Sequence, residues 1–374
     1  MHIPDGYLSP STCATLYVAA APFWYIALQR VRKLLNTRLV PLLSVFSAFS
    51  FVIMMFNLPL PGGTTGHAVG MGIATIVLGP WGSMLAVSVA LLIQALFFGD
   101  GGVTAFGANC FNMAIVGSLV AYWVYRAIAG RSAITSRRRV VAAAIAGYLA
   151  LNVAALLAAI EFGIQPTLFT DAAGAPLYAP YPLSVAVPAM MLGHLTIAGL
   201  AEMMVTGGVV AYLQRSDPTL LKLTAPGAAD PNDRMQSVNQ RGGWRTLRPL
   251  LIGLAILMVL SPLGLLAAGT AWGEWAPEDF STPEGRQEIQ AGSVNQAPPE
   301  GAPAGLDQLS SFWTAPIPDY APPFMQSESF GYILSAVFGT GLIILTFLLI
   351  NWIAGLLRGG REPDPTSHPG AGTV

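Results

Sequence analysis

The chain has 374 residues, of which 53% are hydrophobic and only 10% are charged, and its mean hydropathy is +0.58. A soluble domain is about 25% charged, so too few polar side chains remain here to face water on all sides. The net charge of −1 carries no basic signal for nucleic acid, which we exclude as a partner. The composition therefore predicts an all-α integral membrane protein whose surface faces the lipid bilayer.

Nine apolar segments follow one another along the chain. A helix that crosses a bilayer needs about 20 mostly apolar residues. The third segment is short, and the sequence Gly79-Pro80-Trp81-Gly82 predicts a tight turn between it and the fourth. The predicted membrane segments are residues 11–29, 39–58, 67–80, 81–98, 104–125, 140–160, 183–212, 249–269 and 330–357.

These segments divide into two modules. Residues 1–213 hold seven segments rich in Gly, Ala and Met, and residues 214–247 form a polar linker. Residues 248–374 hold the last two segments on either side of a long loop. We call these parts the first module and the second module, and we expect a seven-span unit fused to a two-span unit.

The basic residues indicate the orientation. With nine segments, every Lys and Arg except Arg286 lies on one side of the membrane. Cations favour the cytoplasmic side, so we expect the linker and the C-terminus in the cytoplasm and the N-terminus outside. The residues on that side are Arg30, Arg32, Lys33, Arg38, Arg126, Arg131, Arg137, Arg138, Arg139, Arg215, Lys222, Arg234, Arg241, Arg245, Arg248, Arg358 and Arg361.

His2 stands where it can chelate a metal. A free amine at Met1, the backbone amide of His2 and its imidazole can bind one cation through fused rings, and a further imidazole completes a plane of four nitrogens. This geometry suits Ni(II), Cu(II) or low-spin Co(II). His67 is the natural fourth ligand, because it follows the glycine-rich stretch PLPGGTTG at the predicted outer end of its segment. The alternative is a histidine that is only hydrogen-bonded.

Four stretches carry a family resemblance. The start MHIPDGYLSP, then GGTTGHAVG, GANCFNMAIVG and GHLTIAGLAEMMVTG, resemble the CbiM/NikM family of substrate-binding S-components of energy-coupling-factor transporters for cobalt or nickel. The resemblance runs from residue 1 to about residue 213. It implies that Met1, His2 and His67 hold the metal, which is the transported substrate. It also implies a prokaryotic cell membrane, a membrane T-component and two ATPase subunits as partners.

The second module resembles the two-span N-type accessory unit of the PDGLE kind. The resemblance lies in WGEW at 272–275, PDY at 318–320 and the flanking segments. The string PDGLE itself is absent, and the nearest text is APEDF at 276–280.

Other polar residues of the first module leave alternatives open. His194 and Glu202 lie in one segment, eight residues and about 12 Å apart on a helix, so we expect structural or gating roles more than ligation. We consider Gln94, Asn109 and Asn112 as their hydrogen-bond partners. Asp5 and Asp100 are expected near the outer face, where they hold the N-terminal segment, attract the cation or lie in a solvated turn. His368 is expected to be a bystander in the tail.

The loop of the second module is acidic. Against Arg286 alone it carries eight carboxylates, which either concentrate a divalent cation near the site or only keep the loop soluble. They are Glu274, Glu278, Asp279, Glu284, Glu288, Glu300, Asp307 and Asp319.

Enzyme signatures are absent from the sequence. Neither Lys33 nor Lys222 lies in a G-x-x-x-x-G-K-[ST] pattern, and H-E-x-x-H and G-x-S-x-G do not occur. We therefore expect a transporter subunit without its own ATPase and without a catalytic cofactor. The alternatives are a self-contained secondary transporter that uses Glu202 for coupling, a membrane scaffold with structural histidines, and, more distantly, a metal-dependent membrane enzyme.

Overall fold

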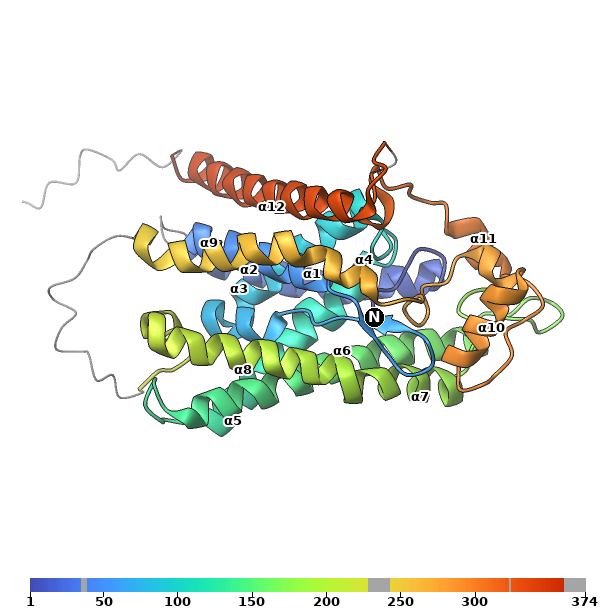
Figure 1. Ribbon diagram of the computed structural model, residues 1–374, viewed down its shortest axis with the longest axis horizontal. Coiled ribbons are helices and arrows are strands. Elements are labelled where there is room, and N and C mark those ends of the chain that lie inside the picture. Colours follow the sequence, from blue (N-terminus) through green and yellow to red (C-terminus); the bar gives the residue numbers. More distant parts are fainter. Residues whose placement is uncertain (35–38, 228–242, 323, 360–374) are drawn as a thin grey trace, which may run out of the picture.

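The protein is a long helical bundle with one end covered by a folded loop (Figure 1). The computed structural model describes residues 1–34, 39–227, 243–322 and 324–359. His368 and the cations Arg38, Arg234, Arg241 and Arg361 lie outside these ranges, as do residues 228–242 of the predicted linker. Within them, seven helices are long and apolar enough to cross a membrane, together with the shorter Val40–Met54. The seven are Pro10–Arg32, Met71–Phe98, Phe106–Ala129, Arg137–Leu168, Leu183–Ser216, Leu247–Leu266 and Glu328–Ile353.

The elements of the first module, in chain order, are α1 (Pro10–Leu34), α2 (Leu39–Met54), β1 (Leu58–Pro59), β2 (Thr65–Gly66), α3 (Met71–Ile93), the π-helix η1 (Gln94–Phe98), α4 (Phe106–Asn109), the π-helix η2 (Cys110–Gly117), α5 (Ser118–Ala129), α6 (Arg137–Leu168), α7 (Leu183–Gly193), the π-helix η3 (His194–Ala198), α8 (Gly199–Ser216) and the 3₁₀-helix η4 (Pro218–Leu221). The two short strands pair antiparallel, with Leu58 opposite Gly66.

The elements of the second module are α9 (Gly243–Leu260), η5 (Ser261–Leu266), η6 (Pro277–Phe280), α10 (Pro283–Gly292), α11 (Ala304–Leu309), η7 (Pro318–Tyr320) and α12 (Glu328–Gly359). Helices α9 and α12 both pack against α2 of the first module. The segment between them carries α10 and α11 and lies over one end of the bundle (Figure 1).

Helix α3 folds back on itself in the middle of the bundle. Gly79 has φ 71° and ψ 169°, which breaks the helix before Pro80. The Ser83 hydroxyl donates to the Met71 carbonyl at 3.5 Å, although these residues would be about 18 Å apart in a continuous helix. The two arms are therefore antiparallel, and the predicted turn between residues 67–80 and 81–98 is confirmed. Helix begins at Met71 rather than residue 67, because Gly70 is left-handed.

Small residues let the core helices approach closely. A Cβ on Gly72 would lie 3.0 Å from the Gly147 Cα and 2.5 Å from the Thr206 hydroxyl oxygen. Such contacts between α3, α6 and α8 replace the hydrophobic driving force that is missing between helices in lipid. They bring the beginning of α3, just after His67, against α8.

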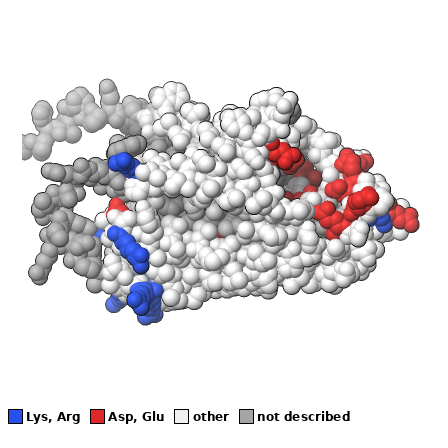
Figure 2. Space-filling view, viewed as in Figure 1, with Lys and Arg blue, Asp and Glu red and all other residues white. Residues whose placement is uncertain are grey.

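The two ends of the bundle differ in charge. Figure 2 shows Lys and Arg at the end where α5 and α8 finish, and Asp and Glu around the loop with α10 and α11. On this face the surface between them shows almost no Lys, Arg, Asp or Glu. This is the separation that a membrane-spanning protein needs, with charged groups kept out of the hydrocarbon layer.

Candidate metal-capture site

The N-terminal segment is inserted into the protein (Figure 1). Met1, His2 and Ile3 are 3%, 1% and 0% exposed. The Ile3 amide donates to the Asn109 side-chain oxygen at 2.8 Å, and Asn109 Nδ2 donates back to the Ile3 carbonyl at 3.0 Å. The amide of Gly102 donates to the same carbonyl at 2.8 Å. Chain termini are usually mobile unless tied down, so these bonds hold the first residues in one place.

Asp5 holds the turn that follows. Its carboxylate accepts from the amides of Val103, at 3.1 Å, and Thr104, at 2.7 Å, and from the Thr104 hydroxyl. A Cβ on Gly102 would lie 2.4 Å from the Asp5 nitrogen, so only glycine allows this approach. Three roles were considered for Asp5: holding the N-terminal segment, attracting the cation, or lying in a solvated turn. Its hydrogen bonds show that Asp5 holds the N-terminal segment.

His2 and His67 meet although 64 residues separate them in sequence. Their rings stack with centroids 4.9 Å apart and planes inclined by 29°. His67 Nδ1 lies 3.1 Å from the Ala68 carbonyl oxygen. Since a carbonyl only accepts, Nδ1 carries the proton and Nε2 keeps its lone pair. Burial lowers the pKa of His67 well below its usual value, and the positive charges of His2 and the N-terminus add to this, so the ring stays neutral.

Asp100 is the first carboxylate of the site. Its Oδ1 lies 2.6 Å from His2 Nδ1. Burial acts to raise the pKa of Asp100, but the charge of the adjacent His2 outweighs it, and the pKa is lowered. Asp100 is therefore ionised and holds His2.

Glu274 is the second carboxylate, and it comes from the second module. Its Oε1 lies 3.4 Å from the Met1 nitrogen. Burial raises the pKa of Glu274, against the opposing effect of the N-terminal ammonium. From sequence, Glu274 was only one of eight acidic residues in the loop. No local pattern distinguishes it, except that it lies within WGEW.

Tyr320 and Gln94 complete the surroundings. The Tyr320 hydroxyl donates to Asp100 Oδ2, and Gln94 Nε2 donates to the same oxygen at 3.0 Å. Gln94 Nε2 also donates to the Tyr320 oxygen at 2.8 Å. Tyr320 was not among the residues predicted for the site, although it ends the PDY motif.

Glu202 acts on the chain just after His67. Its carboxylate accepts from the amides of Val69 and Gly70, both at 2.8 Å, and of Gly72, at 3.1 Å, and from the Thr206 hydroxyl at 3.2 Å. It thereby caps the first turn of α3, whose amides would otherwise be unpaired in the membrane. Of the two roles expected for Glu202, structural or gating, these bonds show the structural one.

The hydrogen-bond partners predicted for His194 and Glu202 were wrong. Asn109 binds Ile3, Gln94 binds Asp100, and Asn112 Nδ2 donates to Glu161 at 2.7 Å. His194 Nδ1 lies 2.8 Å from the Met190 carbonyl in its own helix, and its buried Nε2 has no hydrogen-bond partner among the described residues. Short amide side chains cannot be assigned to partners until the helix packing is known.

Side chains alone do not form a metal cluster here. Within the described part of the chain, no three His, Cys, Asp or Glu side chains are grouped as metal ligands. A chelate that uses the amine of Met1 and the amide of His2 needs only two side chains, His2 and His67. The chemistry available at this site is therefore nitrogen ligation with two carboxylates close by.

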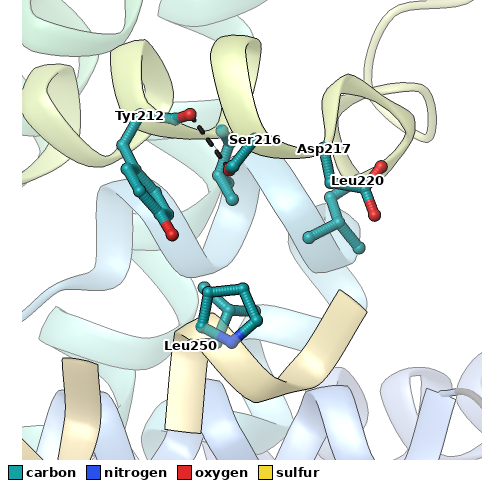
Figure 3. A pocket seen from close by; sticks show the side chains of 7 residues that line it. Tyr212, Ser216, Asp217, Leu220 and Leu250 are labelled. Carbon is teal, nitrogen blue, oxygen red and sulfur yellow. Dashed lines mark hydrogen bonds between the residues drawn. The ribbon is translucent and has the colours of Figure 1, made fainter. Parts of the chain in front are cut away.

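A cavity lies away from the histidines. It has a volume of about 210 Å³ and separates the end of α8 and η4 from α9 (Figure 3). Two of its polar side chains are already engaged: the Ser216 hydroxyl donates to the Tyr212 carbonyl at 3.0 Å, and Asp217 accepts from the Thr219 amide at 3.1 Å. No His lines it, so it offers no imidazole ligand for a transition metal.

The fold and the site together define a multi-pass membrane protein in which the buried Met1, His2 and His67 form a nitrogen-rich site. Residues 2–220 match CbiM, described as a cobalt uptake substrate-specific transmembrane region, and residues 248–356 match the PDGLE domain. The chain belongs to the CbiM family and carries a PDGLE domain, as the sequence motifs indicated.

Two relatives match the chain along nearly its whole length, and a solved structure matches part of it. The chain is 58% identical, over 96% of its length and 99% of the relative's, to the fused nickel transport protein NikMN of Rhodobacter capsulatus. It is 42% identical, over 98% of its length and all of the relative's, to the probable fused nickel transport protein LarMN of Lactiplantibacillus plantarum. A crystal structure of a transition metal transporter is 47% identical with TM-score 0.56, and covers 65% of this chain and all of that one.

Proposed function

We propose that this chain captures Ni²⁺ or Co²⁺ as the substrate-binding S-component of an energy-coupling-factor importer. The observation that carries the proposal is the stacking of His2 on His67, beside the buried Met1 nitrogen. The metal ligands proposed are the Met1 amine, the amide and imidazole of His2, and the imidazole of His67.

The proposed chelate is assembled from groups with matching geometry. The His2 amide and Nδ1 close one ring with the cation, and the amide and the Met1 amine close a second. Nδ1 contacts Asp100 in the structure, so capture exchanges this contact for a metal–nitrogen bond. His67 supplies Nε2, which its hydrogen bond to Ala68 leaves free. Four nitrogens in one plane favour Ni(II) or low-spin Co(II).

The carboxylates around the site also support the proposed metal chelate. A divalent cation bound by one deprotonated amide carries a net charge of +1, which is costly to bury unless it is paired. Asp100 and Glu274 both lie at the site and provide the opposite charge. Because the amine and the amide must lose protons, binding is expected to release protons and to weaken in acid.

The cargo we favour is nickel. The two relatives that match along nearly the whole chain are named as nickel transport proteins. The cobalt transport protein CbiM of Geobacter sulfurreducens is 31% identical over 76% of the chain. Affinity order alone does not separate the two metals, so the choice rests on these relatives.

Transport requires partners and an orientation. The sequence has no P-loop, and the family resemblance implies a membrane T-component coupled to two ATPase subunits. We place the metal-capture site outside and the basic end of the bundle in the cytoplasm of a prokaryotic cell, following the distribution of Lys and Arg. Self-contained transport coupled by Glu202 is the weaker alternative, because backbone amides already occupy that carboxylate.

The test is a metal titration of the full chain with a free Met1 amine, beside a variant with one residue added before Met1. The extension moves the amine but leaves every side chain in place. One-to-one nickel binding that collapses in the extended variant supports the chelate. Equal binding by both proteins removes Met1 from the ligands, and binding by neither contradicts the importer function.

A further inference from the structure

The second module reaches the histidines through Tyr320. This residue ends η7, next to α12, and is 5% exposed. Its hydroxyl and Gln94 Nε2 both donate to Oδ2 of Asp100. The other oxygen, Oδ1, lies 2.6 Å from His2 Nδ1. Asp100 therefore joins the second module on one side to His2 on the other.

Tyr320 is firmly held at this place. Its ring stacks on Phe98 with centroids 4.8 Å apart and packs edge-on against Tyr332 at 5.4 Å. The Ser335 hydroxyl donates to its carbonyl at 2.8 Å. The Asp100 carboxylate accepts from Tyr320 and from Gln94, and the packing around Tyr320 fixes one of these donors. The carboxylate therefore cannot rotate freely.

The backbone at Tyr320 is strained. Asp319 and Tyr320 have φ of 53° and 59°, in the left-handed region that residues other than glycine rarely adopt. Such conformations persist only where surrounding contacts impose them, and they concentrate at functional sites. In this chain the strained turn ends at Tyr320, whose hydroxyl donates to Asp100.

The helix beneath Asp100 is irregular as well. Gln94 begins the π-helix η1, which ends at Phe98 and is followed by Gly99 with φ 71°. Two bonds from the second module tie down its carbonyls: the Ile317 amide donates to Phe97 at 3.0 Å, and Trp313 Nε1 donates to Leu96 at 2.9 Å. π-Helical turns often mark functional sites, and this one brings Gln94 and Asp100 to the same point.

We infer that Tyr320 is a positioning residue of the metal-capture site. With Gln94 it fixes Asp100, which holds the His2 imidazole beside His67 before capture. When His2 Nδ1 exchanges Asp100 for the cation, the fixed carboxylate stays next to the site and balances the charge of the metal. The inference rests on the proposed function and deepens it, because it makes the second module part of the site. A ligand held in place before binding loses less freedom when the metal arrives.

The first experiment is a nickel titration of the full-length protein and of Tyr320→Phe, by calorimetry and by the visible spectrum of the complex. The substitution removes the hydroxyl and keeps the ring that stacks on Phe98. We expect the affinity to fall about 10- to 100-fold, as for other residues that orient metal ligands. The matched control is Tyr332→Phe, since the Tyr332 hydroxyl makes no hydrogen bond to another described residue; its affinity should not change.

The second experiment tests whether Tyr320 acts through Asp100. Asp100→Asn and the double variant are titrated in the same way. If Tyr320 acts through Asp100, the double variant binds about as well as Asp100→Asn alone. Losses that add, or Tyr320→Phe binding like the unchanged protein, overturn the inference.

The outcomes separate this inference from the proposed function. If the unchanged protein binds no nickel, the proposed function fails and the inference with it. If it binds one nickel and Tyr320→Phe binds equally well, only the inference fails. If Tyr320→Phe does not fold, Gln94→Met removes the other donor to Asp100: a loss of affinity of the same order supports the inference, and unchanged affinity overturns it.

Discussion

Replacing Glu202 by Gln should destabilise the beginning of α3. In the structure each oxygen of Glu202 accepts two hydrogen bonds, Oε2 from Val69 and Gly70 and Oε1 from Gly72 and Thr206. An amide keeps only one oxygen, and its NH₂ group then faces two donors. A hydrogen bond to a charged group contributes about 1.5–3 kcal/mol, so two lost bonds cost about 3–6 kcal/mol of unfolding free energy.

The matched control is Glu161→Gln. Glu161 is also a buried membrane carboxylate, but the structure gives its side chain a single hydrogen bond, from Asn112. The amide oxygen of Gln can accept that bond, so we expect a loss of about 1 kcal/mol or less.

Thermal or denaturant unfolding in detergent measures both variants, and a nickel titration follows for those that fold. Because residues 69–72 directly follow His67, Glu202→Gln should also weaken nickel binding, while Glu161→Gln should not. Equal unfolding midpoints for the two variants would refute the assignment of Glu202 to the helix cap.

The remaining predictions concern charge and pH. Glu274→Gln should weaken nickel binding several-fold, because the contact with the Met1 amine is lost. Glu284 is an exposed residue of the same loop, and Glu284→Gln should not change the affinity. Equal losses in titrations of both variants would instead indicate that the acidic loop acts through its overall negative charge. Without metal, the free energy of unfolding should fall as the pH drops below about 6.5, because the pKa of His67 is lowered in the folded protein and the unfolded chain takes up the proton first. It should fall further below about pH 4, because the pKa of Asp100 is also lowered in the folded protein. Melting curves from about pH 7.5 to about 3 check this. His67→Gln should flatten the part between about pH 7.5 and 5, and an unchanged profile would contradict the role of burial at His67.

The contacts between modules suggest why they are fused. Besides Glu274 and Tyr320, the amide of Thr65 donates to the Thr270 carbonyl at 3.3 Å, and the Tyr7 hydroxyl donates to the Trp275 carbonyl at 2.7 Å. The second module thus contacts both segments that bring histidines to the site. Fusion keeps the loop at high effective concentration over this surface.

Much of the architecture was determined by the sequence alone. The charge deficit required lipid on the outside, and runs of apolar residues marked the helices because a bilayer has a fixed thickness. Gly79 and Pro80 predicted the turn inside α3, because glycine readily takes a positive φ and proline has no amide to continue the helix. His2 and His67 were predicted as a pair because their chemistry, and the family motifs around them, are local in sequence.

Only the tertiary structure decided what surrounds that pair. Asp100, Gln94, Glu274 and Tyr320 come from three distant stretches, and no local pattern distinguishes Glu274 from the other carboxylates of its loop. The partners of Glu202 and Asn109 were likewise beyond the sequence, because a short polar side chain takes whichever group the packing places within about 3 Å. Helix formation is local, but the approach of residues 2, 67, 100, 274 and 320 depends on how every helix packs, and the site's surroundings arise only from that packing.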